Sequence, residues 1–253
     1  MKKNWMAHAA LVLLIAAGSA WGDEASIKKL LKERFPELPV QSIKPAPMAG
    51  WYEIFSGNRL FYVDEKADFI FVGSVVEAKS KRNLTEERVR DLMRVKFDIL
   101  PFDDAIKIVK GDGTRKLAVF EDPDCPYCKR VEADIAKVDN LTLYVFLYPI
   151  EQLHADATAK SKKVWCAKDR GKAWHDLMLK NQVPKNKGDC ETPIGRNIAL
   201  ANQLNINGTP ALIFEDGRLA PGAIPKEQIE KFLSEATANK AEAKAKPREA
   251  DKK

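Results

Sequence analysis

The stretch LAVFEDPDCPYCKRV, residues 117–131, constrains the fold of this 253-residue chain more than any other. An apolar run typical of a buried strand meets an acidic turn, and two cysteines follow with two residues between them. A helix that begins here would place the Cys125 sulfur at its N-terminus and Cys128 one turn inside, with Pro126 in the first turn, where a missing N–H costs little. The stretch therefore predicts a strand, a reactive cysteine pair and a helix, in that order.

This position gives the two cysteines different predicted roles. The helix dipole and the free N–H groups of the first turn favour a thiolate at Cys125, the predicted nucleophile. Cys128 is placed to attack a mixed disulfide formed at Cys125, which makes it the predicted resolving thiol. Acidic residues before the pair disfavour the thiolate and basic residues after it partly offset them, so the sequence leaves the sign of the net pKa shift open. These neighbours are Glu121, Asp122, Asp124, Lys129 and Arg130.

Two other roles for the pair are weaker. A zinc site needs two more ligands, but Cys166 and Cys190 are not a second close pair, and His154 and His175 fit no standard zinc pattern. A purely structural crosslink would constrain little of the unfolded chain, because the loop it closes is so short. We predict a redox pair, no metal and no cofactor.

The N-terminus has the layout of a cleaved secretory signal. Two lysines precede a short apolar stretch at residues 9–17, and Ala20 and Gly22 stand three and one residues before the expected cut at Asp23. The apolar run is too short to span a bilayer. We therefore predict a signal peptide at residues 1–22, export to an oxidising compartment and no stable membrane insertion.

The basic charge of the chain does not indicate a nucleic-acid surface. Of the net charge of +6, +2 lies before residue 22 and +3 lies in residues 239–253, which leaves +1 on the rest of the chain. Nucleic-acid binding normally needs a basic stripe on the folded part, so we predict no nucleic-acid partner. The composition of residues 239–253, rich in Ala, Lys and Glu, predicts a disordered tail.

The remaining cysteines differ from the first pair. Cys166 falls in a helical stretch and Cys190 in the polar loop VPKNKGDCETP. In an oxidising compartment an even number of cysteines suggests disulfides. A bond between these two would close a loop of about 25 residues and contribute on the order of 3 kcal/mol through chain entropy. We predict a structural disulfide, with a second redox pair that shuttles with the first as the alternative.

The N-terminal part of the predicted mature chain, residues 23–82, forms a unit of its own. One amphipathic helix is followed by strand-like runs at 51–55, 60–64 and 69–76, separated by turn residues, which predicts an α+β unit with an antiparallel sheet. So small a unit buries little of its own surface. We therefore expect a partner, such as a second copy of the chain, to complete the sheet, with a helix-covered sheet as the alternative.

Two further regions follow. Residues 83–105 form a predicted linker, with an amphipathic helix over residues 83–99. Residues 106–238 begin with a strand, a helix and a strand, continue with helices, and close with a hairpin and a helix. This order predicts a thioredoxin-like α/β arrangement.

The segment NGTPALIF places Thr209 and Pro210 at the start of a strand, where proline is unusual. A cis peptide bond would explain the proline, with an ordinary trans proline at a sheet edge as the alternative. Beside a strand–CxxC–helix unit we predict the cis bond. The backbone of Thr209 and Pro210 would then face the sulfurs and could pair with an extended substrate segment.

Several segments together resemble the periplasmic DsbC and DsbG family, and the resemblance covers most of the mature chain. It implies an α+β N-terminal dimerisation domain with a cystatin-like antiparallel sheet, joined by a linker helix to a thioredoxin-like α/β domain with a helical insertion. It also implies a homodimer whose active sites face an apolar cleft. The segments are SIKPAPMAGWYEI, LFYVDEKADFIFVGSVV, NLTEERV, VFEDPDCPYC, KVWCAKDRGKAWHDLM, NGTPALIFEDGRLAPG and PKEQIEKFL.

By matching position, the resemblance carries family roles onto this chain. It implies the redox pair Cys125 and Cys128, the cis-proline element Thr209 and Pro210, and the structural disulfide Cys166–Cys190. It further implies a periplasmic disulfide isomerase that acts on misoxidised exported proteins and is kept reduced by a membrane reductase of the DsbD type.

One departure separates the chain from DsbC. DsbC has Gly-Tyr between its active cysteines, whereas Pro126 and Tyr127 stand here, as in DsbG. The alternative function is therefore a DsbG-like dimeric chaperone or reductase of cysteine sulfenic acids. Cys166 and Cys190 favour DsbC, and we predict an isomerase.

Overall fold

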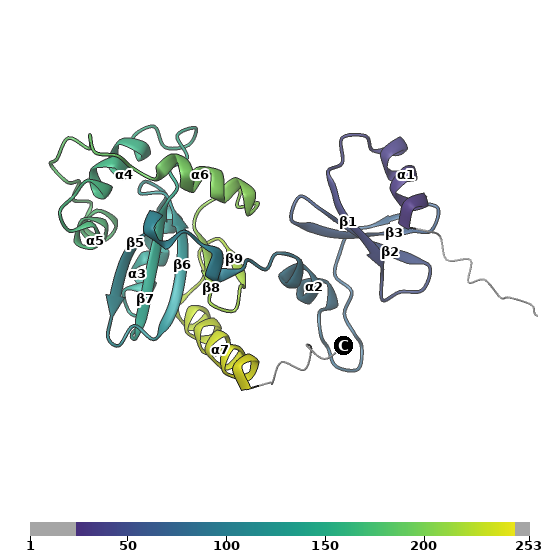
Figure 1. Ribbon diagram of the computed structural model, residues 1–253. Helices are drawn as coiled ribbons and strands as arrows, with labels where there is room; N and C mark the ends of the chain where they lie inside the picture. The colour runs from purple at the N-terminus through teal and green to yellow at the C-terminus, as the bar shows by residue number, and fades with distance from the viewer. Residues whose placement is uncertain (1–23, 246–253) are drawn as a thin grey trace, which may run out of the picture. The chain divides into compact units, whose positions relative to one another are not determined.

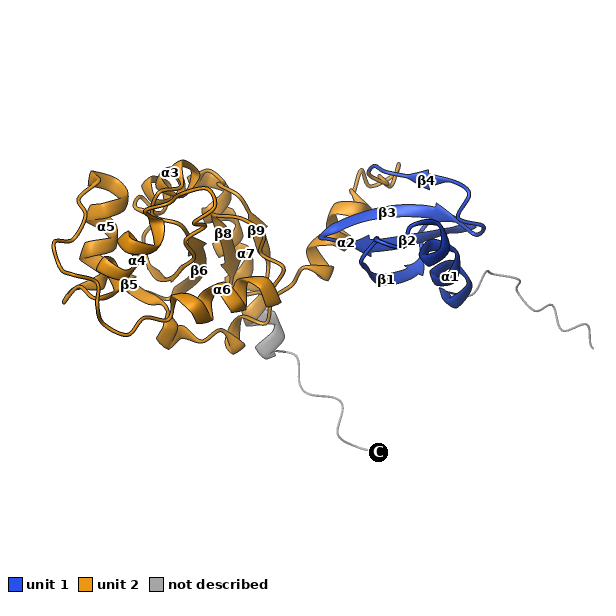
Figure 2. Cartoon of the chain, turned by 90° about the horizontal axis from the view of Figure 1, so that it is seen from above, with its two compact units in different colours: residues 1–73 blue, residues 74–253 orange. Residues whose placement is uncertain are grey.

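The computed structural model describes residues 24–245 (Figure 1). The chain divides into two compact units, Met1–Gly73 and Ser74–Lys253 (Figure 2). The expected signal peptide at residues 1–22 lies outside the described residues. The division falls before the expected linker, because the backbone from Val75 onward bonds to the start of the next helix, with Val75 N–H donating to Thr85 Oγ1 at 2.8 Å.

The N-terminal unit is an antiparallel sheet covered by one helix (Figure 1). The strands follow one another in the order β1-β2-β3-β4, and the turn between β2 and β3 uses Gly57 and Asn58, both at positive φ. The residues that form its core cluster are Ile27, Leu31, Ile43, Tyr52, Ile54, Val63 and Ala67. The elements are α1 (Glu24–Arg34), β1 (Val40–Pro45), β2 (Trp51–Ser56), β3 (Arg59–Asp64) and β4 (Ile70–Phe71).

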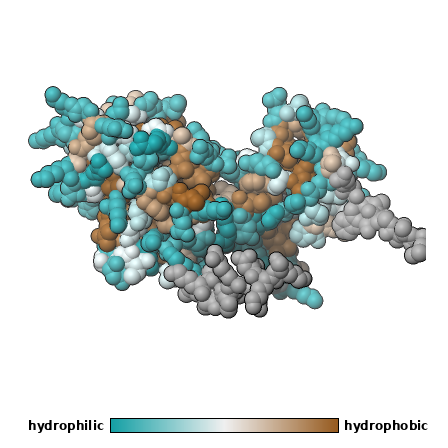
Figure 3. All heavy atoms as spheres, in the orientation of Figure 1, coloured by the Kyte–Doolittle hydropathy of each residue, from teal (hydrophilic) through white to brown (hydrophobic). Residues whose placement is uncertain are grey.

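The outermost strand of this sheet is shorter than the run 69–76 predicts. β4 pairs with β3 through Tyr62 opposite Phe71 and Val63 opposite Ile70, and no further. The apolar residues that flank β4 therefore remain on the surface, and Val72 is 80% exposed. Apolar patches interrupt the hydrophilic surface of this unit in the view of Figure 3.

The predicted helix over residues 83–99 also ends early. α2 spans Leu84–Leu92, and its N-terminus is capped by Asn83, whose side chain accepts from Glu86 N–H at 3.0 Å. Two 3₁₀ turns follow, Phe97–Ile99 and Phe102–Asp104. The helix stops because the next apolar side chains pack into the core of the C-terminal unit instead of continuing its stripe; they are Val95, Phe97 and Leu100.

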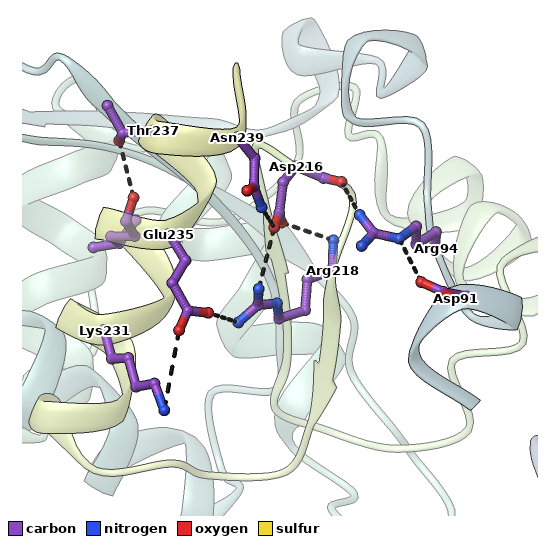
Figure 4. A network of polar contacts seen from close by, with 9 residues as sticks. Asp91, Arg94, Asp216, Arg218, Lys231, Glu235, Thr237 and Asn239 are labelled. Atoms are coloured by element: carbon purple, nitrogen blue, oxygen red, sulfur yellow. Dashed lines mark hydrogen bonds and ion pairs between the residues drawn. The ribbon is translucent and has the colours of Figure 1, made fainter. Parts of the chain in front are cut away.

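Hydrogen bonds connect the segment after α2 to the rest of the C-terminal unit (Figure 4). Arg94 donates from Nη1 to Asp216 O at 2.8 Å, and Val95 N–H donates to Gly217 O at 2.8 Å. Gly217 has φ +87°, and a Cβ at this position would lie 2.5 Å from Val95 O, so the turn requires glycine. Arg218 then pairs with Asp216 and with Glu235 of the last helix.

The C-terminal unit is built on a mixed five-stranded sheet with the order β5-β7-β6-β8-β9. β6 and β7 run parallel, with Phe120 opposite Phe146, and the other pairs are antiparallel. The parallel pair lies inside the sheet, which explains the apolar run of β6. The strands are β5 (Ile106–Lys110), β6 (Arg115–Glu121), β7 (Leu141–Leu147), β8 (Ala211–Phe214) and β9 (Leu219–Pro221).

Helices cover both faces of this sheet, and each face has its own apolar core (Figure 1). α3, α4, α5 and α7 contribute to the core beneath the cysteine pair. α6 contributes to both cores, with Ile194 in this one and Ala201 in the other. α7 continues to Ala245, past the expected end of the domain at residue 238, because Ala, Lys and Glu are strong helix formers. The helices are α3 (Pro126–Ile135), α4 (Ala157–Trp165), α5 (Arg170–Lys180), α6 (Ile194–Gln203) and α7 (Lys226–Ala245). Across residues 24–245, no helix is both long and apolar enough to cross a bilayer.

Candidate active site

The cysteine pair lies where β6 ends and α3 begins. Cys125 is the N-cap residue of α3, with extended backbone at φ −69° and ψ 120°, and Pro126 occupies the first turn. Lys129 N–H donates to Cys125 O at 3.1 Å and closes that turn. The Cys125 side chain keeps a small exposed surface, Cys128 is fully buried, and the two thiols are not bonded to each other. One sulfur therefore borders the surface and the other lies inside the fold.

The environment of Cys125 favours its thiolate. A hydrogen bond from the Cys128 side chain makes the largest contribution and, with smaller ones from the backbone N–H groups of Cys128 and Tyr127 and from the Thr209 side chain, lowers the pKa of Cys125 from 9.0 to about 5. Burial opposes this effect but does not cancel it. These N–H groups belong to the first turn of α3, which has no intrahelical acceptors for them. Cys125 is therefore ionised at neutral pH.

Cys128 behaves in the opposite way. Burial raises the pKa of Cys128 far above its ordinary value, and the hydrogen bond to Cys125 and the charge of Glu121 raise it further. Cys128 therefore keeps its proton at neutral pH and donates it toward the Cys125 sulfur. The pair has a nucleophile at the surface and a protonated thiol beneath it.

The carboxylates of Asp122 and Asp124, just before Cys125, have hydrogen-bond or ion-pair partners that stabilise their negative charge. Asp122 is fully buried; its Oδ1 accepts from Asp124 N–H at 2.8 Å, and its Oδ2 accepts from Ile150 N–H at 2.7 Å. His154 Nδ1 also lies 3.0 Å from Asp122 Oδ2. The Asp124 carboxylate binds Lys160 Nζ at 2.7 and 2.9 Å. These contacts explain why the acidic turn does not prevent a low pKa at Cys125.

Two buried carboxyl groups lie on the inner side of the pair, and sequence reasoning missed their importance. Glu121 is fully buried at the end of β6, and Glu132 of α3 is 4% exposed. The sequence suggested Glu121 only as a nearby charge and did not single out Glu132. Two signals could have found them: Glu121 closes an apolar strand, and Glu132 follows Cys128 by four residues, on the same helix face.

The predicted cis-proline element lies beside the nucleophile. The Thr209–Pro210 peptide bond is cis, and the Cys125 sulfur lies 3.5 Å from Thr209 O. The register of the sheet produces this proximity, because Phe120 of β6 pairs with Ala211 at the start of β8. Pro210 is buried and Thr209 is half-buried. The structure thus brings together residues 84 positions apart in the sequence.

The residue after Pro126 faces outward. Tyr127 is 58% exposed, and the Arg130 guanidinium lies over its ring, 5.3 Å from the centroid. Lys129 Nζ donates to Asn181 Oδ1 at 2.6 Å. An aromatic ring and a basic group therefore stand on the surface next to the nucleophile.

Cys166 and Cys190 form a disulfide with a Cα–Cα distance of 5.7 Å. Cys166 ends α4, and Cys190 lies in the polar segment before α6, so the bond closes a loop that contains α5. Cys190 is on the surface and Cys166 is half-buried. Among the residues that the structure describes, no group of three or more His, Cys, Asp or Glu side chains is arranged to hold a metal ion.

Known proteins resemble both units. Residues 18–86 match the disulfide bond isomerase protein N-terminal domain, and residues 102–237 match a thioredoxin-like domain. The predicted fold class, an α+β unit followed by a thioredoxin-like α/β domain, is confirmed.

Curated proteins that are similar to this chain are named as thiol:disulfide interchange proteins. The probable thiol:disulfide interchange protein DsbC of Bordetella parapertussis is 40% identical over 208 residues, which cover 82% of this chain and 73% of that protein. The thiol:disulfide interchange protein DsbC of Escherichia coli K12 is 29% identical over 242 residues, covering 93% and 97%. A crystal structure of a disulfide interchange protein from Neisseria gonorrhoeae is 42% identical with a TM-score of 0.53, covering 54% of this chain and 98% of that one.

Proposed function

Because the chain belongs to the DsbC family of thiol:disulfide interchange proteins, we propose that it is a disulfide isomerase whose nucleophile is Cys125. The observation that carries the proposal is the asymmetry of the pair. The pKa of Cys125 is lowered to about 5 at the helix N-terminus, while burial keeps the proton on Cys128. Nucleophilic attack on a disulfide needs a thiolate that is accessible, and only Cys125 meets both conditions.

The reaction begins when the Cys125 thiolate attacks a wrong disulfide of a substrate protein. A bond forms between Cys125 and one substrate sulfur, and the other substrate sulfur leaves as a thiolate. That thiolate can attack a second substrate disulfide, and a further exchange then releases Cys125, so the disulfides are rearranged with no net oxidation. If rearrangement stalls, Cys128 attacks the mixed disulfide and releases the substrate reduced.

The segment before β8 is the proposed binding edge for the substrate backbone. Thr209 O lies 3.5 Å from the Cys125 sulfur, so a chain held along Thr209 and Pro210 would present its disulfide to the nucleophile. The exposed ring of Tyr127, two residues after Cys125, offers apolar contact near the nucleophile.

The N-terminal unit is the proposed dimer interface, formed with a second copy of the chain. Its outer strand β4 is two residues long and lies at the edge of the sheet. Large apolar side chains are exposed here, with Phe69 at 69%, next to Ile70, Phe71 and Val72. An unpaired apolar edge is a ready template for pairing with another strand.

We further place the protein in the periplasm, where it would act on misoxidised exported proteins. Support comes from the secretory signal layout of residues 1–22. Each time Cys128 resolves a mixed disulfide, the pair becomes oxidised and needs a reductant before the next attack. A membrane reductase of the DsbD type is the proposed source of these electrons.

Refolding of a scrambled multi-disulfide protein tests the proposal. The wild-type chain should restore activity to the scrambled substrate, and Cys125→Ser should abolish this while the protein stays folded and the dimer, checked by light scattering, stays intact. Full activity in Cys125→Ser would overturn the proposal. Suppression of aggregation that survives Cys125→Ser but is lost in a monomeric variant would instead support the chaperone-like alternative.

A further inference from the structure

The segment that leads to the cis peptide bond contains a residue pair that the proposed reaction does not use. Asn207 precedes Gly208, and it is the one asparagine of the 253-residue chain that is followed by glycine. The backbone nitrogen of a residue can attack the side chain of an asparagine before it. Glycine allows this attack most readily, because it has no side chain to obstruct it and few limits on its backbone. The pair is therefore a candidate for covalent change.

The groups that would react are unrestrained in the structure. Asn207 is exposed and Gly208 is half-buried. Within residues 24–245, neither the Asn207 side chain nor the Gly208 N–H has a hydrogen-bond partner. A Cβ built at Gly208 would meet no atom within 4 Å, so the space around the pair is open. The side-chain carbon and the backbone nitrogen can therefore approach each other.

Other turns of the chain show the opposite arrangement. Asp216 precedes Gly217, and an aspartate can form the same ring by the same kind of attack. Here Gly217 N–H donates to Phe214 O at 2.9 Å, and Asp216 Oδ1 accepts from Arg218 N–H at 3.1 Å. The pair Asp112–Gly113 is held by hydrogen bonds of the same two kinds. Both turns restrain the groups that would have to meet, whereas the Asn207 pair has no such restraint among the described residues.

The ends of the segment are fixed on both sides of the pair. Ile206 is 3% exposed and belongs to the core on the α6 side of the sheet. Pro210 is buried just before β8. The three residues between them, 207–209, include Thr209, whose O lies 3.5 Å from the Cys125 sulfur. A change in the length of so short a segment must therefore move Thr209.

We propose that Asn207 is a modification site, where spontaneous deamidation alters the edge that binds the substrate backbone. The functional part of this inference rests on the proposed function, because it acts on the binding edge at Thr209 and Pro210. Deamidation would make the attack of Cys125 on protein disulfides decline as the protein ages, without any change in the two active cysteines.

The reaction needs no reactant other than water. The Gly208 nitrogen attacks Asn207 Cγ, the bond between Cγ and the side-chain nitrogen breaks, and that nitrogen leaves as ammonia with the proton of the Gly208 N–H. Water then opens the cyclic imide, with no oxidation or reduction. Opening at Cγ gives aspartate, which adds one negative charge. Opening at the main-chain carbonyl gives isoaspartate, which adds the same charge and also one methylene group to the backbone.

The two products should differ in their effect on the substrate. Aspartate keeps the backbone length, and its carboxylate takes the place of an exposed amide, where salt screens its charge. Isoaspartate lengthens the chain between two fixed ends, so Thr209 O moves from its place beside the Cys125 sulfur. A misplacement of about 1 Å in a group that positions a substrate can lower a rate about a hundredfold. Isoaspartate is therefore the product that slows attack on peptide disulfides.

Ageing of the full, reduced protein tests the inference. The protein is incubated in mildly alkaline buffer, digested, and analysed by mass spectrometry for a gain of about 1 Da at each asparagine. An isoaspartyl methyltransferase with a labelled methyl donor measures the isoaspartate. Attack on a disulfide peptide is measured in the Cys128→Ala background, which traps the mixed disulfide, and alkylation by a small reagent reports the Cys125 thiolate separately.

The chain offers matched variants for each step. Gly208→Ala hinders ring formation, and it fits because a Cβ there has open space and φ lies outside the left-handed region. Asn207→Gln keeps an amide but disfavours the ring, since its side chain is longer. Asn207→Asp supplies the charge of the product without the longer backbone. The aged wild-type protein carries both changes.

We expect Asn207 to deamidate about tenfold faster than every other asparagine of the folded chain, and Gly208→Ala to slow this about tenfold. The isoaspartyl form should attack the disulfide peptide about tenfold more slowly, and Asn207→Asp should stay within about twofold of wild type. Alkylation of Cys125 should change less than about twofold in both forms, because most of its hydrogen-bond donors belong to α3. Treatment with the methyltransferase, which returns isoaspartate to aspartate, should restore the attack rate.

Two results would overturn the inference. Deamidation of Asn207 at the rate of the other asparagines would remove the site. Wild-type attack by the isoaspartyl form, or equally slow attack by Asn207→Asp, would show that the backbone length at Thr209 does not matter. The isomerase proposal is tested separately, by the refolding activity of Cys125→Ser.

Discussion

The two cysteine pairs of this chain show how the surroundings decide what a pair of sulfurs does. Cys125 and Cys128 are two residues apart, unbonded, and placed at the start of a helix above buried carboxyl groups. Cys166 and Cys190 are 24 residues apart, bonded to each other, and near the surface. Backbone N–H groups stabilise a thiolate at Cys125 of the first pair, whereas the disulfide of the second pair closes a loop.

Next to each cysteine pair, one side chain stabilises the loop through two hydrogen bonds to the backbone. Asp122 accepts from two backbone N–H groups before Cys125. Asn186 donates to Lys163 O at 2.8 Å and accepts from Gly188 N–H at 2.9 Å before Cys190. Asp122 is fully buried, whereas Asn186 is half-buried in a loop that the disulfide also holds. The reactive pair therefore depends more on its surrounding contacts, and the bonded pair more on its covalent link.

Deleting the disulfide should produce the largest change in stability. In Cys166→Ala with Cys190→Ala, the free energy of unfolding should fall by about 3 kcal/mol, because the unfolded chain regains loop entropy. Urea denaturation measures this change, and the rate of Cys125 alkylation in the same protein should not alter. Loss of isomerase activity without loss of stability would show that the second pair takes part in the redox chemistry.

Asp122→Asn should have the next largest effect. The amide offers one acceptor oxygen in place of two, so one of the N–H groups of Asp124 and Ile150 loses its partner in a buried site. We expect a loss of about 2 kcal/mol in the free energy of unfolding. Asn186→Ala is the matched change beside the other pair, and should cost less than about 1 kcal/mol because its loop is less buried. Equal costs would remove the contrast between the two loops.

The reactivity of Cys125 should depend on pH around a low midpoint. Its alkylation rate in the folded, reduced protein should fall as the pH falls through about 5, while Cys128 stays unreactive. At pH 6 Cys125 should react about tenfold faster than a cysteine of the unfolded chain, because its larger thiolate fraction outweighs its weaker intrinsic nucleophilicity. Mass spectrometry after timed alkylation identifies the modified residue, and a midpoint near 9 would contradict the low pKa.

The same pKa predicts how stability depends on pH. The pKa of Cys125 is lower in the folded protein than its ordinary 9.0, so its contribution to the stability of the reduced form is complete above pH 9. The contribution declines as the pH falls toward 5, and below that value it is lost. The difference in unfolding free energy between reduced wild type and Cys125→Ser isolates this effect and should decrease from pH 8 to pH 4.

Pro126→Gly should have the smallest effect. Pro126 occupies the first turn of α3, where its missing N–H costs nothing and its fixed φ limits the unfolded chain. We expect a loss of less than about 1 kcal/mol in denaturation of the reduced protein. The Cys125 alkylation midpoint should stay near 5, because the N–H donors come from Tyr127 and Cys128. A clear shift of the midpoint would show that Pro126 tunes the thiolate itself.

The sequence by itself determined the local architecture of the active region. Apolar periodicity, the CPYC spacing and Pro126 predict a strand, a nucleophile and a helix, and the structure has them in that order. These features depend on neighbours along the chain, whose geometry is set by the backbone alone. The division into an α+β unit and a thioredoxin-like unit was accessible for the same reason.

The tertiary structure alone decided the sign of the pKa shift at Cys125. The sequence places three acidic residues before it, but the partners that bind two of them, Ile150 and Lys160, come from distant segments. It also decided that Glu121 and Glu132 meet beneath the pair, and that α2 ends where Val95 turns into the core. Electrostatic effects depend on distance through space and on burial, which are fixed only when elements far apart in the chain come together.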